Sequence, residues 1–274
     1  MSMVECWPQF NKEFYKMENK NHPSNWKYSS TEEEGFFEIV TPENSACKIT
    51  WIYRLNLASS SEYILQNDKL ELNAAVIRGV VKISCNSENY NLEKFDSFYL
   101  PAKEKLVITA TADCSIFIGG GIFYKRGKFF VRKYDLSLPL GDIHQIHGKP
   151  PYQREVFMTV AQQDEASSLI CGITIGEPGK WTSWPPHQHT MDLEEVYCFF
   201  DIPRPQSAFH YASRKMGEFE YIHPVSTGDC VIVPEGYHPT CGMPGVKSCY
   251  FWVMTAHKKT SRRYDLAVND PRFE

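Results

Sequence analysis

Hydrophobic and polar residues alternate in short segments along most of this chain, beginning near Phe36 and ending near Thr255. The segments are rich in β-branched and aromatic residues, and turn-forming pairs such as Asn67-Asp68 and Asn86-Ser87 separate them. Apolar positions with helical spacing are almost absent. Short strands at close spacing predict an all-β sandwich or barrel. The predicted strands are 36–40, 47–57, 74–84, 97–100, 106–110 and 115–123, followed by 155–161, 169–175, 195–201, 207–212, 231–233 and 249–255.

The strands fall into two copies of one pattern. Residues 95–101 (FDSFYLP) resemble residues 228–234 (GDCVIVP), because in both an Asp stands five residues before a Pro that ends an apolar strand. Two copies at this separation indicate a duplicated domain and not a solenoid. The predicted organisation is an N-terminal arm (1–30), a first domain (31–125), a crossover (126–153) and a second domain (154–274). The aromatic residues that should pack the arm onto the body or a neighbouring subunit are Trp7, Phe10, Phe14, Tyr15 and Trp26.

Composition narrows the class of protein. The 274 residues suffice for one large or two moderate domains. The net charge of −4 is not clustered, and the lack of a basic stripe argues against nucleic-acid binding. No apolar run is long enough to cross a bilayer, and the polar N-terminus is unlike a signal peptide. Nine cysteines without a Cys-x-x-Cys pair predict buried free thiols. We expect a cytoplasmic, soluble homo-oligomer that acts on a small molecule and binds neither nucleic acid nor membrane.

The residues best suited to chemistry lie in one stretch, 184–197. His187 and His189 point to the same face if they lie on a strand, because side chains alternate along a strand. A polar turn follows, and Glu194-Glu195 then opens a second strand. Two imidazoles and a carboxylate brought together by a tight turn supply most of a site for zinc, iron or manganese. His238, which follows the 228–234 strand, is the expected fourth ligand.

The first copy lacks these ligands. Lys105 stands where the second copy has His238, and no histidine lies between His22 and His144. The first domain is therefore predicted to be structural, and the second to carry the chemistry. The histidines without a partner spacing, which we expect on the surface, are His210, His223 and His257.

A His-x-His pair, a nearby Glu and a distant Pro-x-Gly-x-His segment together resemble the cupin superfamily. Gly228, Pro234, Gly236 and His238 lie at or near its second motif, with one residue instead of two between Gly236 and His238. Residues 176–189, 193–197 and 233–239 more closely resemble the 5-deoxy-glucuronate isomerase family of inositol catabolism. The Glu-Val-Tyr strand is also similar to the sister family, the 5-keto-4-deoxyuronate isomerases of pectin breakdown. The resemblance is strong over about 154–256 and faint before it.

This resemblance implies an all-β bicupin, in which two tandem jelly-roll β-barrels of the cupin type follow one another and the second holds a divalent metal. Zinc is the metal we expect, with manganese and iron as alternatives. The implied activity is aldose–ketose isomerisation of 5-deoxy-glucuronate to 5-deoxy-2-keto-gluconate. The alternatives are a 5-keto-4-deoxyuronate isomerase, a bicupin that binds a sugar acid without catalysis, and an iron-dependent dioxygenase.

The identity of the carboxylate ligand is open at this stage. General cupin spacing favours Glu194, whereas alignment on the Glu-Val-Tyr strand of the sister family favours Glu195, with one residue inserted in the turn. We prefer Glu195, because insertion in a turn is easier than a slip of strand register, which moves every side chain to the other face. The predicted metal ligands are thus His187, His189, Glu195 and His238.

Two further roles are predicted outside the ligand set. The proton-transferring base is Glu194, Tyr237 or a metal-bound hydroxide. Arg154 opens the first strand of the second domain, and the resembling family has an arginine near this position. A guanidinium fork suits a substrate carboxylate, and a salt bridge is the alternative role.

Overall fold

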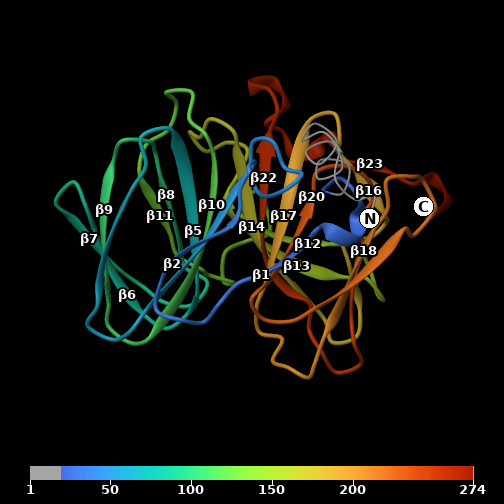
Figure 1. Ribbon diagram of the computed structural model, residues 1–274, viewed down its shortest axis with the longest axis horizontal. Helices are drawn as coiled ribbons and strands as arrows, with labels where there is room; N and C mark the ends of the chain where they lie inside the picture. Colours follow the sequence, from blue (N-terminus) through green and yellow to red (C-terminus); the bar gives the residue numbers. More distant parts are fainter. Residues whose placement is uncertain (1–19, 274) are drawn as a thin grey trace, which may run out of the picture.

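The computed structural model describes residues 20–273, and among these it contains strands and short 3-10 turns but no α-helix. Two β-barrels lie side by side, one from each half of the chain (Figure 1). The predicted all-β bicupin is therefore confirmed. The first barrel combines a six-stranded sheet, in the order β11-β8-β5-β10-β3-β2, with a four-stranded sheet, β4-β9-β6-β7. Its strands are β2 (Gly35–Val40), β3 (Trp51–Leu57), β4 (Glu62–Gln66), β5 (Leu70–Arg78), β6 (Val81–Cys85), β7 (Glu88–Leu92), β8 (Ser97–Leu100), β9 (Lys105–Ala110), β10 (Cys114–Ile122) and β11 (Phe130–Arg132).

The second barrel repeats this arrangement. A seven-stranded sheet in the order β1-β20-β17-β22-β14-β13-β12 faces a four-stranded sheet, β15-β21-β18-β19, and β16 pairs with β23. The central order β20-β17-β22-β14-β13 matches β8-β5-β10-β3-β2 of the first barrel strand for strand. The strands are β1 (Lys27–Ser29), β12 (His144–His147), β13 (Arg154–Val160), β14 (Leu169–Gly176), β15 (Trp181–Thr182), β16 (His187–Gln188), β17 (Leu193–Phe199), β18 (Ala208–Ala212), β19 (Tyr221–Val225), β20 (Asp229–Val233), β21 (Thr240–Gly242), β22 (Cys249–Ala256) and β23 (Val268–Asn269).

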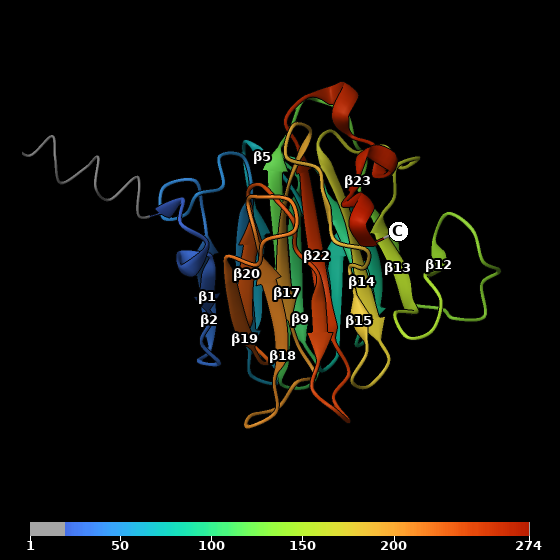
Figure 2. The same cartoon turned by 90° about the vertical axis from the view of Figure 1, so that its right-hand side faces the viewer.

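The segments predicted as connections supply edge strands. β1, from the predicted arm, pairs with β20 and places Trp26 in the core of the second barrel. β11 and β12, from the predicted crossover, pair with β8 of the first barrel and β13 of the second. β12 projects from the body together with its loop (Figure 2). The other aromatic residues of the predicted arm lie outside the described residues.

The predicted strand 74–84 is two strands, and Gly79 explains the break. Its φ of +81° belongs to the left-handed region, and a Cβ would lie 2.2 Å from the carbonyl oxygen of Asp113. Only glycine fits such a position, so β5 ends at Arg78 and β6 begins at Val81. The two strands belong to opposite sheets of the first barrel.

The interiors of the two barrels differ. The first is filled by a closed apolar cluster to which β5 contributes Leu72, Ala74 and Val76. These positions alternate with Glu71, Asn73 and Ala75 on the face turned toward the second barrel, as strand geometry requires. Apolar side chains therefore fill the interior of the first barrel.

Two buried glutamates join the barrels reciprocally. The Glu71 carboxylate on β5 accepts backbone hydrogen bonds from Ser167, Ser168 and Leu169, where β14 begins, at 2.6–2.8 Å. The Glu194 carboxylate on β17 accepts hydrogen bonds from the residues where β3 begins. Its donors are the backbone N–H groups of Lys48 (2.6 Å) and Ile49 (3.1 Å) and the hydroxyl of Thr50 (3.0 Å). Each glutamate is the second residue of its strand, and its carboxylate accepts hydrogen bonds from donors at a strand start in the opposite barrel.

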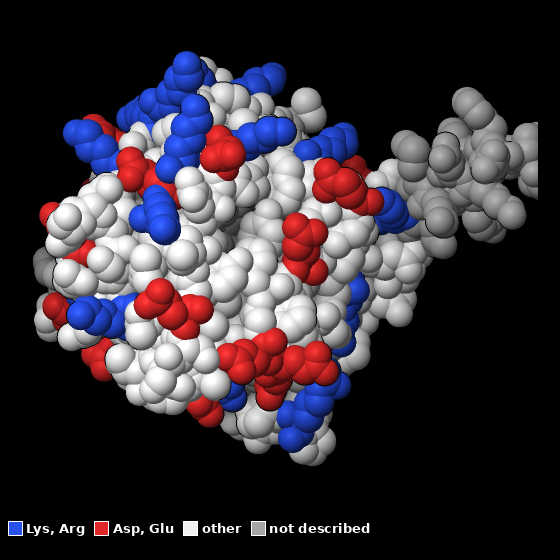
Figure 3. All heavy atoms as spheres, turned by 60° about the vertical axis from the view of Figure 1, so that its left-hand side comes forward, with Lys and Arg blue, Asp and Glu red and all other residues white. Residues whose placement is uncertain are grey.

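Residues 20–273 include no helix long and apolar enough to span a bilayer. The cysteines in this range are free, and all but Cys241 are buried, as predicted. Acidic and basic side chains are interspersed on the face shown in Figure 3, without a continuous basic stripe. The cytoplasmic location and the homo-oligomer remain predictions.

Candidate metal centre

The predicted ligands come from three places in the second barrel. His187 lies on β16 and His189 follows it, Glu195 is on β17, and His238 lies in the connection from β20 to β21. A cavity of about 180 Å³ opens between the sheets beside them. The residues that line it are His147, Arg154, Val156, Thr174, Ser183, Trp184, Pro185, His187, His189, Leu193, Glu195, Tyr197, Tyr250, Trp252, Met254, Tyr264, Ala267 and Asn269.

Three of the predicted ligands converge on one point. Nε2 of His189 lies 3.0 Å from Oε2 of Glu195, and Nε2 of His238 lies 3.1 Å from the same oxygen. All three side chains are buried, and their ligand atoms lie within 4.8 Å of one another. The ring of His187 is next to them, with its centroid 4.6 Å from that of His238. The geometry thus brings three of the four predicted ligands together and places the His187 ring beside them, while metal binding by the four stays a prediction.

The orientation of the imidazoles is fixed by the backbone. In each of the three histidines Nδ1 donates a hydrogen bond to a carbonyl oxygen, which leaves Nε2 as the nitrogen that faces the centre. The acceptors are Pro185 for His187 (2.9 Å), Leu193 for His189 (3.0 Å) and Gly236 for His238 (3.0 Å). Such backbone bonds set the tautomer and ring orientation of histidines that bind metals. When His189 and His238 are neutral, their Nε2 lone pairs face the same oxygen of Glu195, an arrangement that a bound proton or metal cation stabilises.

The electrostatics of the centre agree with this need. Burial acts to raise the pKa of Glu195, but the hydrogen bonds and charges of His189 and His238 outweigh it and lower the pKa below its usual range. Burial acts to lower the pKa of His189, but the hydrogen bond and charge of Glu195 outweigh burial, so the pKa of His189 is raised above its usual value. Burial, with a smaller effect of His238, lowers the pKa of His187 to about 3, so this ring is neutral at pH 7.

Glu194 does not line the cavity, and this position argues against the catalytic role predicted for it. Neighbouring residues on a strand point to opposite faces, and on β17 Glu195 and Tyr197 face the cavity while Glu194 faces the first barrel. The sequence contained a signal that Glu194 joins the two barrels. Leu70-Glu71 and Leu193-Glu194 occupy equivalent places in the two copies, and Leu72 stands where the second copy has Glu195.

The position of Tyr237 does not support the catalytic role predicted for it either. It precedes His238 but does not line the cavity, and its backbone pairs with Ser213 in an isolated bridge. Two predictions about histidines are wrong. His210 and His223 are buried and not on the surface, and Nδ1 of His210 lies 3.0 Å from the Thr240 hydroxyl.

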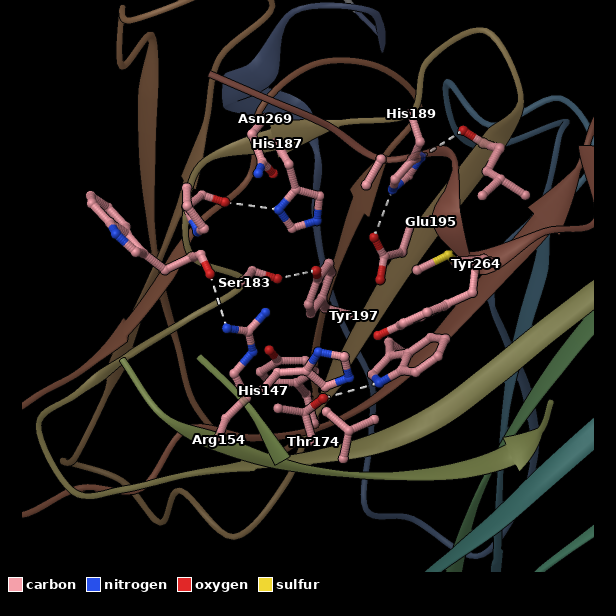
Figure 4. A pocket seen from close by; sticks show the side chains of 18 residues that line it. His147, Arg154, Thr174, Ser183, His187, His189, Glu195, Tyr197, Tyr264 and Asn269 are labelled. Carbon is pink, nitrogen blue, oxygen red and sulfur yellow. Dashed lines mark hydrogen bonds and ion pairs between the residues drawn. The ribbon is translucent and has the colours of Figure 1, made fainter. Parts of the chain in front are cut away.

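Arg154 lies in the cavity, as the prediction of substrate binding requires. Its Nη1 donates to the carbonyl oxygen of Trp184 at 2.9 Å. Figure 4 shows His187, His189 and Glu195 on one side of the cavity and Arg154 with His147 on the opposite side. Between them lies the Tyr197 hydroxyl, 2.6 Å from the Ser183 hydroxyl. The cavity therefore has a side with histidines and a carboxylate, a cationic side and a polar middle.

Sequence reasoning missed the wall that the C-terminal segment supplies. β23 pairs with β16, and this register places Asn269 opposite His187. Tyr264, from the 3-10 turn before β23, lines the cavity and stacks on Trp252 at 5.7 Å. The anchor of the segment is Arg262, whose guanidinium donates to the carbonyl oxygens of Ala161, Gln162 and Leu169. No sequence motif marks this segment, because only the fold brings it to the cavity.

The fold and this cavity define the class of protein: a bicupin whose second barrel holds a His/Glu centre suited to a metal. Comparison with known proteins then gives the family. The model of the KduI/IolB family matches residues 26–274, and the chain belongs to this family. The predicted family is confirmed.

The relatives agree with this assignment. A 5-deoxy-glucuronate isomerase of Halalkalibacterium halodurans is 32% identical over 253 residues, which is 86% of this chain and 90% of the relative. One from Geobacillus kaustophilus is 25% identical over 264 residues, 88% and 91% of the two chains. With relatives of this name over most of its length, the chain is an isomerase of this family, as predicted.

Solved structures support the fold. An IolB-like protein of Salmonella typhimurium superposes with a TM-score of 0.80 at 19% identity, over 91% of this chain and 98% of the other. An oxalate decarboxylase of Bacillus subtilis, described with Mn(II) centres, superposes with a TM-score of 0.56 at 13% identity, over 89% and 79% of the two chains. At these identities the likeness concerns the fold alone.

Proposed function

We propose that this protein is a metal-dependent aldose–ketose isomerase that converts 5-deoxy-glucuronate to 5-deoxy-2-keto-gluconate in myo-inositol catabolism. The observation that carries the proposal is the convergence of His189, Glu195 and His238, with His187 beside them, at the edge of a cavity that has a guanidinium on its opposite side. The relatives bearing the name of this enzyme supply the substrate.

The donor set fits a divalent ion, and zinc is the ion we propose. Three imidazole nitrogens and one carboxylate are ligands that zinc accepts, and manganese and iron accept them too. A divalent ion held there would polarise the sugar carbonyl and favour loss of the neighbouring C–H proton. The backbone bonds to Nδ1 of the three histidines hold the rings ready for it, so little reorganisation accompanies binding.

The remaining cavity residues position the open-chain sugar. Arg154 has a planar guanidinium suited to the terminal carboxylate, which would place the carbonyl end at the His/Glu side. Tyr197 and Ser183 supply hydroxyls to the middle of the chain. Burial, reinforced by Glu195, raises the pKa of Tyr197 well above its usual range. Its phenol therefore stays neutral and donates a hydrogen bond to a substrate oxygen.

The test is an assay of zinc-loaded protein on two substrates, with the products followed by NMR. We expect conversion of 5-deoxy-glucuronate to the keto acid, and loss of both metal and activity in His238→Ala. Turnover of 5-keto-4-deoxyuronate alone would assign the sister reaction. Stoichiometric metal in a folded His238→Ala variant would refute the proposed centre. Binding of either acid without turnover, at full metal content, would leave a sugar-acid-binding protein.

A further inference from the structure

A second polar cavity, of about 340 Å³, lies between the two barrels and shares no lining residue with the isomerase cavity. The first barrel contributes the middle of β3, the end of β5 and the start of β10, and the second contributes the turn after β17 and the approach to β20. Its lining residues are Glu32, Arg54, Ile77, Arg78, Gly79, Lys94, Ser115, Phe200, Asp201, Pro203 and Thr227. β17 connects the two cavities, and Phe200, which directly follows this strand, lies five positions after Glu195, a span of roughly 16 Å.

The cavity contains a buried guanidinium with little anionic compensation. The side chain of Arg54 is 2% exposed, and its nearest carboxylate, that of Glu32, is 68% exposed and lies 3.9 Å away. Nε donates to Asn56 and Nη1 donates to the Ser30 hydroxyl, so neither partner carries a charge. Burial of a charge that is not closely paired is costly. The neighbourhood of Arg54 therefore favours the arrival of an anion.

Two neighbouring cations, Arg78 and Lys94, add to the positive charge of Arg54 in this cavity. Burial lowers the pKa of Arg54, Glu32 partly offsets this, and the charge of Arg78 adds to the lowering. Lys94 also lines the cavity and is paired with Asp201 at 2.7 Å. The lining thus holds three cations and two carboxylates: Asp201 pairs closely with Lys94, and Glu32 lies at the longer distance of 3.9 Å from Arg54.

Ser115 supplies an independent sign of a ligand. Its side chain is 1% exposed, and its buried hydroxyl has no hydrogen-bond partner among the described residues. The ladder of β10 and β5 places it directly opposite Arg78. Buried hydroxyls are nearly always bonded, so this one calls for an acceptor. A guanidinium pair with a hydroxyl matches an anion that has several acceptor oxygens.

Gly228 keeps the space beside Arg54 open. Its φ of +91° favours glycine, and a Cβ would lie 3.0 Å from Nη1 of Arg54. The same glycine begins the repeated 228–234 motif, where the first copy has Phe95. The second copy therefore has a small residue at the position that touches this guanidinium.

We propose that this interdomain cavity binds an oxyanion of the phosphate class, held by Arg54, Arg78 and the hydroxyl of Ser115. The anion contacts residues of the first barrel in a cavity that the second barrel closes, and its binding stabilises the contact between them. The site is separate from the isomerase centre and does not depend on the proposed reaction.

The experiment is thermal unfolding of the metal-loaded protein in a series of inorganic phosphate concentrations, with sodium chloride at matched ionic strength as reference. At a phosphate concentration 100-fold above the dissociation constant, we expect the midpoint to rise by roughly 5–10 °C. Arg78→Gln and Ser115→Ala should abolish this rise. Lys128→Gln, which changes an 85% exposed cation outside the cavity, should keep it.

Ser115→Ala also keeps the test decisive. Its hydroxyl has no partner, so the variant should fold with unchanged or higher stability in chloride while losing the response to phosphate. An equal rise in wild type, Arg78→Gln and Ser115→Ala would overturn the proposal, as would no rise beyond that in chloride. A response lost in His238→Ala but kept in Arg78→Gln would place phosphate at the metal centre, which also overturns it. Stabilisation by acetate and not by phosphate would refute the assignment to the phosphate class.

Discussion

Glu194 and Glu195 are adjacent on β17, and changing each to glutamine should affect a different property. Glu194→Gln should lower stability, and Glu195→Gln should weaken metal binding. Glu194 accepts three hydrogen bonds from residues 48–50 of the first barrel, each charge-assisted. A glutamine keeps one acceptor oxygen, but its amide NH₂ would face a donor. Hydrogen bonds to charged groups contribute about 1.5–3 kcal/mol each, so Glu194→Gln should lower the free energy of unfolding by about 3 kcal/mol. The midpoint of unfolding should fall by roughly 6–12 °C.

Glu195→Gln should show the opposite pattern. It removes the anion on which His189 and His238 converge, so the metal content should fall severely while the protein folds. The readouts are thermal unfolding and elemental analysis of both variants, prepared side by side. Glu71→Gln is the matched control, because it alters the reciprocal contact from the first barrel and should reproduce the destabilisation with full metal content. Metal loss in a stable Glu194→Gln variant would refute the assigned faces of β17.

Three further predictions follow from the cavity. Arg154→Gln should raise KM for the uronate at least 10-fold with a smaller change in kcat, and an unchanged KM in steady-state kinetics would contradict carboxylate binding. Tyr197→Phe should retain metal and lower kcat about 10-fold, since it removes one hydroxyl from the substrate; a fully active variant would exclude that contact. In chelator-treated protein, unfolded His187 binds a proton between pH 6.5 and about 3 that the folded protein does not, so stability should fall as pH falls through this window. His187→Gln should flatten that decline in denaturant titrations, and an identical slope in both proteins would refute it.

The sequence determined the features that depend on local order. Strand alternation places His187 and His189 on one face, and the short turn to β17 brings a glutamate back to them, so three of the four proposed ligands lie within nine residues. The repeated 95–101 and 228–234 segments predicted the duplication, which the two barrels confirm. A first barrel without chemistry stays a prediction. The sequence could predict the duplicated fold because period-two patterning and turn spacing act over a few residues.

Tertiary structure decided what depends on which face meets which partner. Glu194 and Glu195 are equally polar, and only the packing of β17 between its own barrel and the first one turns the former toward residues 48–50 and the latter toward the metal centre. The burial of His210 and the approach of Asn269 to His187 are also long-range outcomes. A side chain's role in a barrel follows from strand register and from the element that covers each face, and neither is encoded in the residues adjacent to it.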